Sequence, residues 1–312
     1  MSAGCEAEPF EVFIDRGVVL TIGVFDGVHR GHQHLISQVV ARAKELGCLS
    51  AALTFDRHPQ TVLKPEVGPA YLTTIEEKMS LLASLGLDVR LLLHFDQSVA
   101  DLSARDFVAC LNKRLRLCEL WIGPDFALGR RREGTPGLLQ EIGRDQGFTV
   151  HAVPPLRIDD EVVSSTLVRQ KLAAGDVRAA ARLLGRFPRL TGRVVVGARR
   201  GRQIGFPTAN VDVADSLVLP ADGVYAVCAH LGDETHEAVT NIGVRPSFDN
   251  GRRTIEAHLL DFNADIYGKI LSLEFIERLR GETRFPSVEG LVRQIRRDVE
   301  QARAILRTEP CH

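Results

Sequence analysis

GVFDGVHRGH, at residues 23–32, overlaps the end of the apolar run VVLTIGVF, at residues 18–25, and leads into a helical pattern at residues 32–46. A buried strand that enters a glycine-rich turn and then a helix is typical of the first unit of a parallel α/β sheet. Such a turn exposes backbone N–H groups beside the positive end of the helix dipole, which favours an anion there. We therefore predict an α/β fold, in which this turn is a candidate anion site.

The two histidines of the turn, His29 and His32, allow three interpretations. They can cap an ordinary tight loop, or join His34 in a zinc site, although no Glu or Cys stands at a helical spacing to complete one. They can also contact nucleotide phosphates and stabilise the charge that develops during attack at the α-phosphorus. Gly27 and Gly31 allow the backbone to come close to a phosphate. The spacing alone does not choose among the three.

Strands and helices continue to alternate through the first 185 residues. The predicted strands lie at 50–55, 89–95 and 118–123, and the predicted helices at 74–86 and 103–115. This order predicts βαβ units and a parallel sheet covered on both faces. Ligands of such sheets bind beyond the carboxyl ends of the strands, where the turn at residues 23–32 is expected.

The pattern changes after GRFPRLTG, at residues 185–192. Short strands with period-2 alternation follow, separated by turn residues, which predicts a compact antiparallel barrel or sandwich. A final helix, with Ser287 as its expected N-cap, closes the chain. Its apolar residues recur every three or four positions: Val288, Leu291, Ile295, Val299, Ala302 and Leu306. We predict two domains, at residues 1–185 and 186–312.

Composition restricts the class of protein and its partners. The net charge of −1 produces no field toward nucleic acid or an anionic membrane. The start MSAGCEAEPF is acidic and lacks an apolar core segment, so we do not expect it to be a signal peptide. No apolar stretch approaches the roughly 20 residues that cross a bilayer. The six cysteines form no CxxC pair, which fits a reduced cytoplasmic enzyme better than a disulfide scaffold. We expect a cytoplasmic monomer or transient oligomer without nucleic-acid or membrane partners.

GRQIGFPTANV, at residues 201–211, carries a second candidate site. Pro207 favours an extended backbone, in which Thr208 and Asn210 project to the same side. Their hydroxyl and amide oxygens are hard donors that suit Mg²⁺ beside ATP phosphates. An ordinary polar turn is the alternative interpretation. Glycines that allow close approach to a phosphate, and arginines that supply charge, frame the stretch: Gly197, Gly201, Gly205, Arg199, Arg200 and Arg202.

RTIEAHLLDF, at residues 253–262, alternates along a predicted strand. Thr254, Glu256 and His258 share one face, and the apolar residues between them share the other. If the polar face lines a cavity, Glu256 can accept a proton from a substrate hydroxyl as a general base. A strand residue that faces solvent is the alternative.

The first half resembles a known family of nucleotide-transferring enzymes. The HxGH core of GxFDGxHxGH resembles the signature of the nucleotidylyltransferase superfamily. With TFDRHP at 54–59 and VSSTLVRQKL at 163–172, it resembles the FAD synthetase half of bifunctional riboflavin kinase/FAD synthetases. The resemblance implies a Rossmann-like adenylyltransferase that joins FMN to the AMP part of ATP.

The same resemblance implies roles for single residues. It implies that His29 and His32 hold the ATP phosphates and that Asp125, in GPDFALG, lies near the substrates. Arg169, whose guanidinium fork matches phosphate oxygens, would close over them. Further ATP contacts are implied for Gly23, Phe25, Asp26, Gly31, Ser164 and Thr166.

The second half resembles riboflavin kinases. The motifs run in the order of that family: GFPTAN at 205–210, GVYAV at 223–227, TNIGVRPSF at 240–248, IEAHLLDF at 255–262 and FPSVEGLVRQIRRD at 285–298. The resemblance implies a six-stranded barrel with a flanking helix. It implies that Thr208 and Asn210 bind Mg²⁺ with ATP, that Glu256 activates the ribityl 5′-hydroxyl of riboflavin, and that Phe285 helps enclose the isoalloxazine ring.

Together these resemblances imply an enzyme that makes FMN from riboflavin and ATP, then FAD from FMN and a second ATP, both with Mg²⁺. Two positions depart from the family pattern: Ala127 and Leu167 stand where a basic residue is usual or frequent. They keep one alternative open, a monofunctional riboflavin kinase with an impaired adenylyltransferase domain. A non-catalytic regulator that binds flavin or nucleotide is the other.

Overall fold

The structure is a computed structural model that describes residues 13–63, 70–197, 201, 204–244 and 253–311. Arg199, Arg200 and Arg202 of the second motif lie outside the described residues. The chain divides into two compact units, Met1–Ser165 and Thr166–His312. Each unit is an architecture of its own.

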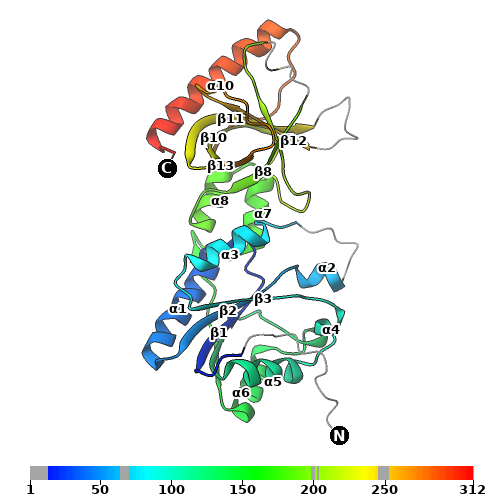
Figure 1. Cartoon of the computed structure of the whole chain (residues 1–312), viewed down its shortest axis with the longest axis vertical. Helices are drawn as coiled ribbons and strands as arrows, with labels where there is room; N and C mark the ends of the chain where they lie inside the picture. Colours follow the sequence, from blue (N-terminus) through cyan, green and yellow to red (C-terminus); the bar gives the residue numbers. More distant parts are fainter. Residues whose placement is uncertain (1–12, 64–69, 198–200, 202–203, 245–252, 312) are drawn as a thin grey trace. The chain divides into compact units, whose positions relative to one another are not determined.

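A five-stranded parallel sheet forms the centre of the first unit, in the order β3-β2-β1-β4-β5 (Figure 1). All five residues of the central strand β1 are buried, as expected of a strand covered on both faces. The predicted parallel sheet is confirmed. Its strands are β1 (Val18–Ile22), β2 (Leu49–Phe55), β3 (Val89–Leu93), β4 (Leu117–Ile122) and β5 (Thr149–Ala152).

Helices cover both faces of this sheet (Figure 1). Val19 of β1 packs in the core beneath α1 (Arg30–Leu46) and α3 (Ile75–Ala83), and Leu20 packs in the core beneath α5 (Ala104–Leu115) and α6 (Pro136–Gln146). Alternating strand residues therefore supply two separate cores. Short elements connect these parts: η1 (Asp26–Val28), α2 (Pro59–Leu63), α4 (Gln97–Ala100), η2 (Arg130–Arg132), β6 (Arg157–Ile158) and β7 (Glu161–Val162).

Six antiparallel strands of the second unit close into a barrel, in the order β10-β11-β12-β9-β8-β13. Tyr225 and Phe275 meet edge to face at 5.3 Å and are fully buried. The predicted barrel is confirmed, and the sandwich is excluded. The elements are α7 (Ser165–Ala173), α8 (Val177–Leu184), β8 (Arg189–Val195), β9 (Ala209–Asp212), β10 (Gly223–Leu231), β11 (Glu234–Val244), β12 (Arg253–Leu259) and β13 (Ile270–Arg280).

The C-terminal helix α10 (Val288–Thr308) lies along the outside of the barrel (Figure 1). The Ser287 hydroxyl accepts a hydrogen bond from the Gly290 N–H at 3.1 Å, so the predicted N-cap is confirmed. Ala302 and Leu306, in the second half of the helix, are buried against β10 and β13. Val288 is 56 % exposed, so the first half of the predicted apolar face lies outside the core.

A disulfide joins Cys228, on β10, to Cys311, three residues beyond α10. Their Cα atoms are 5.4 Å apart, although 83 residues separate them in the chain. The expectation that the cysteines stay reduced is therefore wrong for this pair. Spacing in a sequence shows short CxxC pairs, but it does not show which distant cysteines a fold brings together.

Among the described helices, none combines the length and the apolar character needed to cross a bilayer.

Candidate active sites

The turn that follows β1 has an unusual backbone. Phe25 and Val28 adopt left-handed conformations, with φ values of 49° and 39°. This region is costly for any L-residue and most costly for a β-branched one, and such strain tends to occur at functional sites. Both side chains are 1 % exposed, so their burial holds the turn in place. The result is a rigid loop at the carboxyl end of the central strand.

His29 and His32 lie face to face at the start of α1. Their ring centroids are 3.6 Å apart and the rings are 17° from parallel. The Nδ1 of His29 accepts the N–H of His32 at 3.3 Å, so His29 caps the helix. His34 instead contacts Gln38 on the exposed surface. Within the described part of the chain, no three His, Cys, Asp or Glu side chains are grouped as a metal would need.

The environment of His32 favours the neutral imidazole. Burial, and then the nearby His29 and Lys78, hold the pKa of His32 well below its usual range. Its Nδ1 is buried and has no hydrogen-bond partner among the residues described. An orphaned polar atom of this kind calls for a partner that the protein itself does not supply.

Lys78 is a residue that the sequence analysis missed. It lies on α3 and is 7 % exposed, and its ammonium donates to the carbonyls of Phe55 at 2.7 Å and Val24 at 3.2 Å. Burial lowers its pKa, and Asp26 and Asp56 partly oppose this effect. The signal was a lysine four positions before the buried Leu82, on the inner face of a helix.

Asp26 is 4 % exposed and fixes neighbouring backbone. Its carboxylate accepts the Leu72 N–H at 2.9 Å, and its carbonyl accepts the Ser165 hydroxyl at 3.0 Å. A Cβ on Gly31 would lie 3.1 Å from the His29 ring and 3.2 Å from the Val163 carbonyl. The segment at 163–165, which includes Ser164, therefore lies against the histidine turn.

The remaining predicted residues of the first site lie on several elements. A Cβ on Gly23 would meet the Phe25 ring at 2.9 Å, so the turn is closely packed there. Asp125 is exposed in the loop after β4, which is the parallel neighbour of β1. Both loops therefore leave the same edge of the sheet. Thr166 and Arg169 lie on α7.

In the barrel, Glu256 on β12 lies directly opposite Asn210 on β9. Glu256 is also the cross-strand partner of Asn241 on β11. Side chains of directly opposed residues share a face, with Cβ atoms about 4.5–5.5 Å apart. Three polar side chains thus form a row across the barrel wall. Asn241 was not predicted from the sequence. It nevertheless alternates with the buried Thr240 and Ile242, as Glu256 alternates with its own buried neighbours.

One cavity of about 1180 Å³ brings together four residues predicted from the sequence: Gly201, Thr208, Glu256 and Phe285. Apolar side chains form much of its wall, among them Leu291 and Ile295 from the first half of α10. This explains why that half of the helix leaves the core. Glu256 is half-buried and lines this cavity.

A second cavity, of about 460 Å³, shares Thr208 with the first. Pro207, Phe262 and Tyr267 contribute to its wall. The His258 ring pairs with the Pro207 carbonyl at 2.7 Å, which ties this segment to β12. Thr208 therefore borders both cavities.

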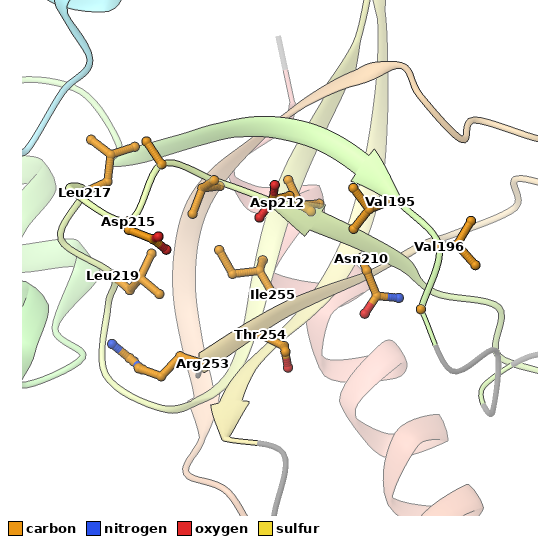
Figure 2. A pocket seen from close by; sticks show the side chains of 14 residues that line it. Val195, Val196, Asn210, Asp212, Asp215, Leu217, Leu219, Arg253, Thr254 and Ile255 are labelled. Atoms are coloured by element: carbon orange, nitrogen blue, oxygen red, sulfur yellow. The ribbon is translucent and has the colours of Figure 1, made fainter. Parts of the chain in front are cut away.

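Asn210 lines a third hollow, of about 330 Å³, together with Thr254, Ile255 and Arg253 (Figure 2). A Cβ on Gly197 would come within 2.1 Å of the Asn210 amide. Any larger residue at position 197 would therefore force the Asn210 amide to move. Gly197 thus makes room for Asn210 within the protein, besides allowing the close approach to a phosphate that the sequence predicts.

The comparisons with known proteins cover nearly the whole chain. Residues 13–167 match the family model described as FAD synthetase, and residues 184–306 match the one described as riboflavin kinase. The bifunctional riboflavin kinase/FMN adenylyltransferase of Pseudomonas fluorescens is 43% identical over 93% of both chains. That of Haemophilus influenzae is 38% identical over 93% of this chain and 94% of its own.

A solved structure shows the same architecture. It is described as a macrolide-efflux protein from Streptococcus pneumoniae, and it is 32% identical with a TM-score of 0.87. The match covers 94% of this chain and 96% of the other. The fold is thus shared across the full length.

Proposed function

The chain belongs to the bifunctional riboflavin kinase/FMN adenylyltransferase family, and from this premise we propose that its two halves divide the reactions. The barrel phosphorylates riboflavin with ATP to give FMN. The α/β half transfers the adenylyl group of a second ATP to FMN and yields FAD and pyrophosphate. The observation that carries the proposal is the pairing of Glu256 with Asn210 beside a cavity that also contains Thr208.

In the barrel, Glu256 accepts the proton of the ribityl 5′-hydroxyl as that oxygen attacks the γ-phosphorus. Thr208 and Asn210 supply oxygen ligands for Mg²⁺, and the donor set fits a hard cation. When bound with ATP, Mg²⁺ neutralises charge on the phosphates. We assign flavin to the larger cavity, whose wall includes Phe285 and apolar side chains of α10, and the nucleotide to the smaller one, which shares Thr208 with it. Phe285 contacts the isoalloxazine ring of the flavin. Gly201 and Gly205, in the stretch at residues 201–211, allow the backbone to approach the ATP phosphates.

In the α/β half, His29 and His32 contact the ATP phosphates at the positive end of α1. Burial keeps the His32 ring neutral, and its unpartnered Nδ1 is suited to a hydrogen bond with a ligand. Ser164, Thr166 and Arg169 contact the same phosphates, and Asp125 contacts substrate. Gly23, Phe25, Asp26 and Gly31 shape the turn that holds them. The transfer requires positioning and charge stabilisation more than covalent chemistry.

We place the boundary between the two functional domains at residues 185 and 186, close to residue 184, where the riboflavin kinase match begins. The compact units of the structure divide earlier, after Ser165. We further propose a cytoplasmic enzyme that acts as a monomer or transient oligomer, without nucleic-acid or membrane partners. Its substrates, riboflavin, FMN and ATP, are small molecules.

A second candidate is a monofunctional riboflavin kinase, and it is favoured by Ala127 and Leu167. Both side chains lack the positive charge that is usual or frequent at these positions. Arg130, Arg131 and Arg132 follow the first of them in the chain, and their charge compensates if it reaches the ligand.

One time course separates the candidates. The purified protein is incubated with riboflavin, ATP and Mg²⁺, and riboflavin, FMN and FAD are resolved by chromatography. FMN followed by FAD and pyrophosphate supports the bifunctional enzyme. Accumulation of FMN alone, also when FMN is supplied, supports the monofunctional kinase. Binding without any product would point to a regulator.

A further inference from the structure

A buried ion pair lies in the wall of the larger barrel cavity. Asp298, on α10, is 3 % exposed and accepts the Arg280 guanidinium at 2.8–3.1 Å through both carboxylate oxygens. Gln294 donates to the same carboxylate at 2.9 Å. Charge-assisted bonds with two contacts fix geometry as well as supplying energy. The arginine therefore has one defined position at the end of β13.

Arg280 in turn contacts Phe285. Its guanidinium carbon lies 5.7 Å from the centroid of the Phe285 ring, within the range of a cation–π contact. Arg280, Phe285 and Asp298 all line the cavity that contains Glu256. From the end of β13, Arg280 therefore contacts both Phe285 and Asp298 of α10.

A buried ion pair is weak evidence for stability, because removing two charges from water costs about as much as their attraction returns. Its presence in a cavity wall indicates that the position of the Arg280 guanidinium, and not the stability of the fold, is what the pair provides. Arg303 of the same helix pairs with Asp261 at 2.7 Å and with Glu237 at 3.5 Å, is more exposed than Arg280, and lies outside the cavity lining. Exposed pairs of this kind contribute little.

We infer that the Arg280–Asp298 pair is a positioning device for flavin: it fixes the ring of Phe285 against the cavity and so sets the affinity for riboflavin, without taking part in phosphoryl transfer. This inference rests on the proposed kinase function of the barrel. A flat aromatic ligand gains from an aromatic partner held at one angle, because an ordered partner loses less freedom on binding. Leu291 and Ile295 supply the apolar remainder of the wall.

The test is a double-mutant cycle on the full-length protein, read by quenching of riboflavin fluorescence without ATP. We expect Asp298→Asn to raise the riboflavin Kd about tenfold. This change corresponds to an energy within the range of interactions between contacting residues. Phe285→Leu should raise it similarly, and the two changes together should do no more than Phe285→Leu alone. With riboflavin saturating, the kcat of Asp298→Asn should stay within about threefold of wild type and the KM for ATP should not change.

Arg303→Gln is the control, since it removes the ion pairs of the same helix with Asp261 and Glu237, both outside the cavity, and it should bind riboflavin as wild type does. A Kd that does not change in folded Asp298→Asn, effects that multiply in the double variant, or a large loss of kcat at saturation would each overturn the inference. If Asp298→Asn does not fold, Gln294→Ala gives the same cycle in milder form. Wild-type protein that neither binds nor phosphorylates riboflavin would instead contradict the kinase function itself.

Discussion

Glu256 and Asn210 are direct cross-strand partners on β12 and β9, so the proposed proton acceptor and a proposed metal ligand lie opposite each other on neighbouring strands. Because Gln cannot accept the proton, Glu256→Gln should lower FMN formation about 10²–10⁴-fold. FAD formation from supplied FMN should not change. Chromatography of each product measures both rates. Glu234→Gln, on the exposed end of β11, is the control. Equal loss of both reactions in Glu256→Gln would contradict the assignment.

His29→Ala should give the reciprocal result. Loss of the imidazole removes a phosphate contact and the cap of α1, which costs about 1 kcal/mol of stability. We expect FAD formation to fall at least a hundredfold while FMN formation continues. His34→Ala, on the exposed side of the same helix, should leave both rates unchanged. An adenylyltransferase rate that survives in His29→Ala would remove the histidine pair from the mechanism.

Gly31→Ala tests whether the histidine turn tolerates added volume. The new methyl group would press on the His29 ring from 3.1 Å and on the Val163 carbonyl from 3.2 Å. The displaced imidazole should slow FAD formation by about tenfold or more, since small misplacement of a positioned group is costly. Gly137→Ala, on α6 with open space around it, should be harmless or stabilising by about 0.5–1 kcal/mol. Comparable activity in the two variants would contradict this prediction.

The lowered pKa of His32 predicts a loss of stability in acid. Burial, with His29 and Lys78, depresses the folded-state pKa below the ordinary value of 6.5. Below pH 6.5 the unfolded chain then binds more protons than the folded one, so the free energy of unfolding falls as pH falls toward the folded pKa. His32→Gln should flatten this dependence between pH 6.5 and 5. Trp121, the single tryptophan and part of β4, reports unfolding of the first unit by fluorescence. An unchanged slope would show that other groups control it.

The Cys228–Cys311 disulfide should stabilise the barrel unit. The chain-entropy model gives about 4–5 kcal/mol as an upper value for a loop closed over 83 residues. Cys311→Ser should therefore lower the free energy of unfolding in guanidinium by up to that amount, measured by circular dichroism. A thiol reductant should lower wild type to the level of the variant and leave the variant unchanged. Wild type that does not respond to reductant would show that the bond does not form in solution.

Periodic segments could be predicted well from sequence, and their ends less well. The alternation around Glu256 placed its apolar neighbours on one common face of the strand, and the structure buries that face. The apolar run at 18–25 predicted a longer strand than β1, because Phe25 is buried in the turn and not in the sheet. Apolar character reports burial in either case, and the left-handed backbone that ends the strand has no signal in residue type.

Contacts between distant residues were beyond the sequence. The charges of Arg280 and Asp298 were visible, but so were those of their neighbours, and nothing in the order of residues shows which pair is buried. The burial of Lys78 was missed for another reason, because lysine is normally exposed. Four of the residues that motifs singled out in the barrel, by contrast, do gather around one cavity, whereas Asn210 lines another hollow: the four are Gly201, Thr208, Glu256 and Phe285.

The short strand β9 meets β12 through only two described pairs, Asn210 with Glu256 and Ala209 with Ala257. Side chains reverse direction at each step along a strand. Deleting a single residue between Gly205 and Ala209 would therefore turn the amide toward the barrel interior and bring Ala209 or Val211 to the outer face. The length of this loop is thus constrained as well as its residue types. Substitutions in it leave Asn210 opposite Glu256, whereas an odd change in length would turn Asn210 away from the proposed metal.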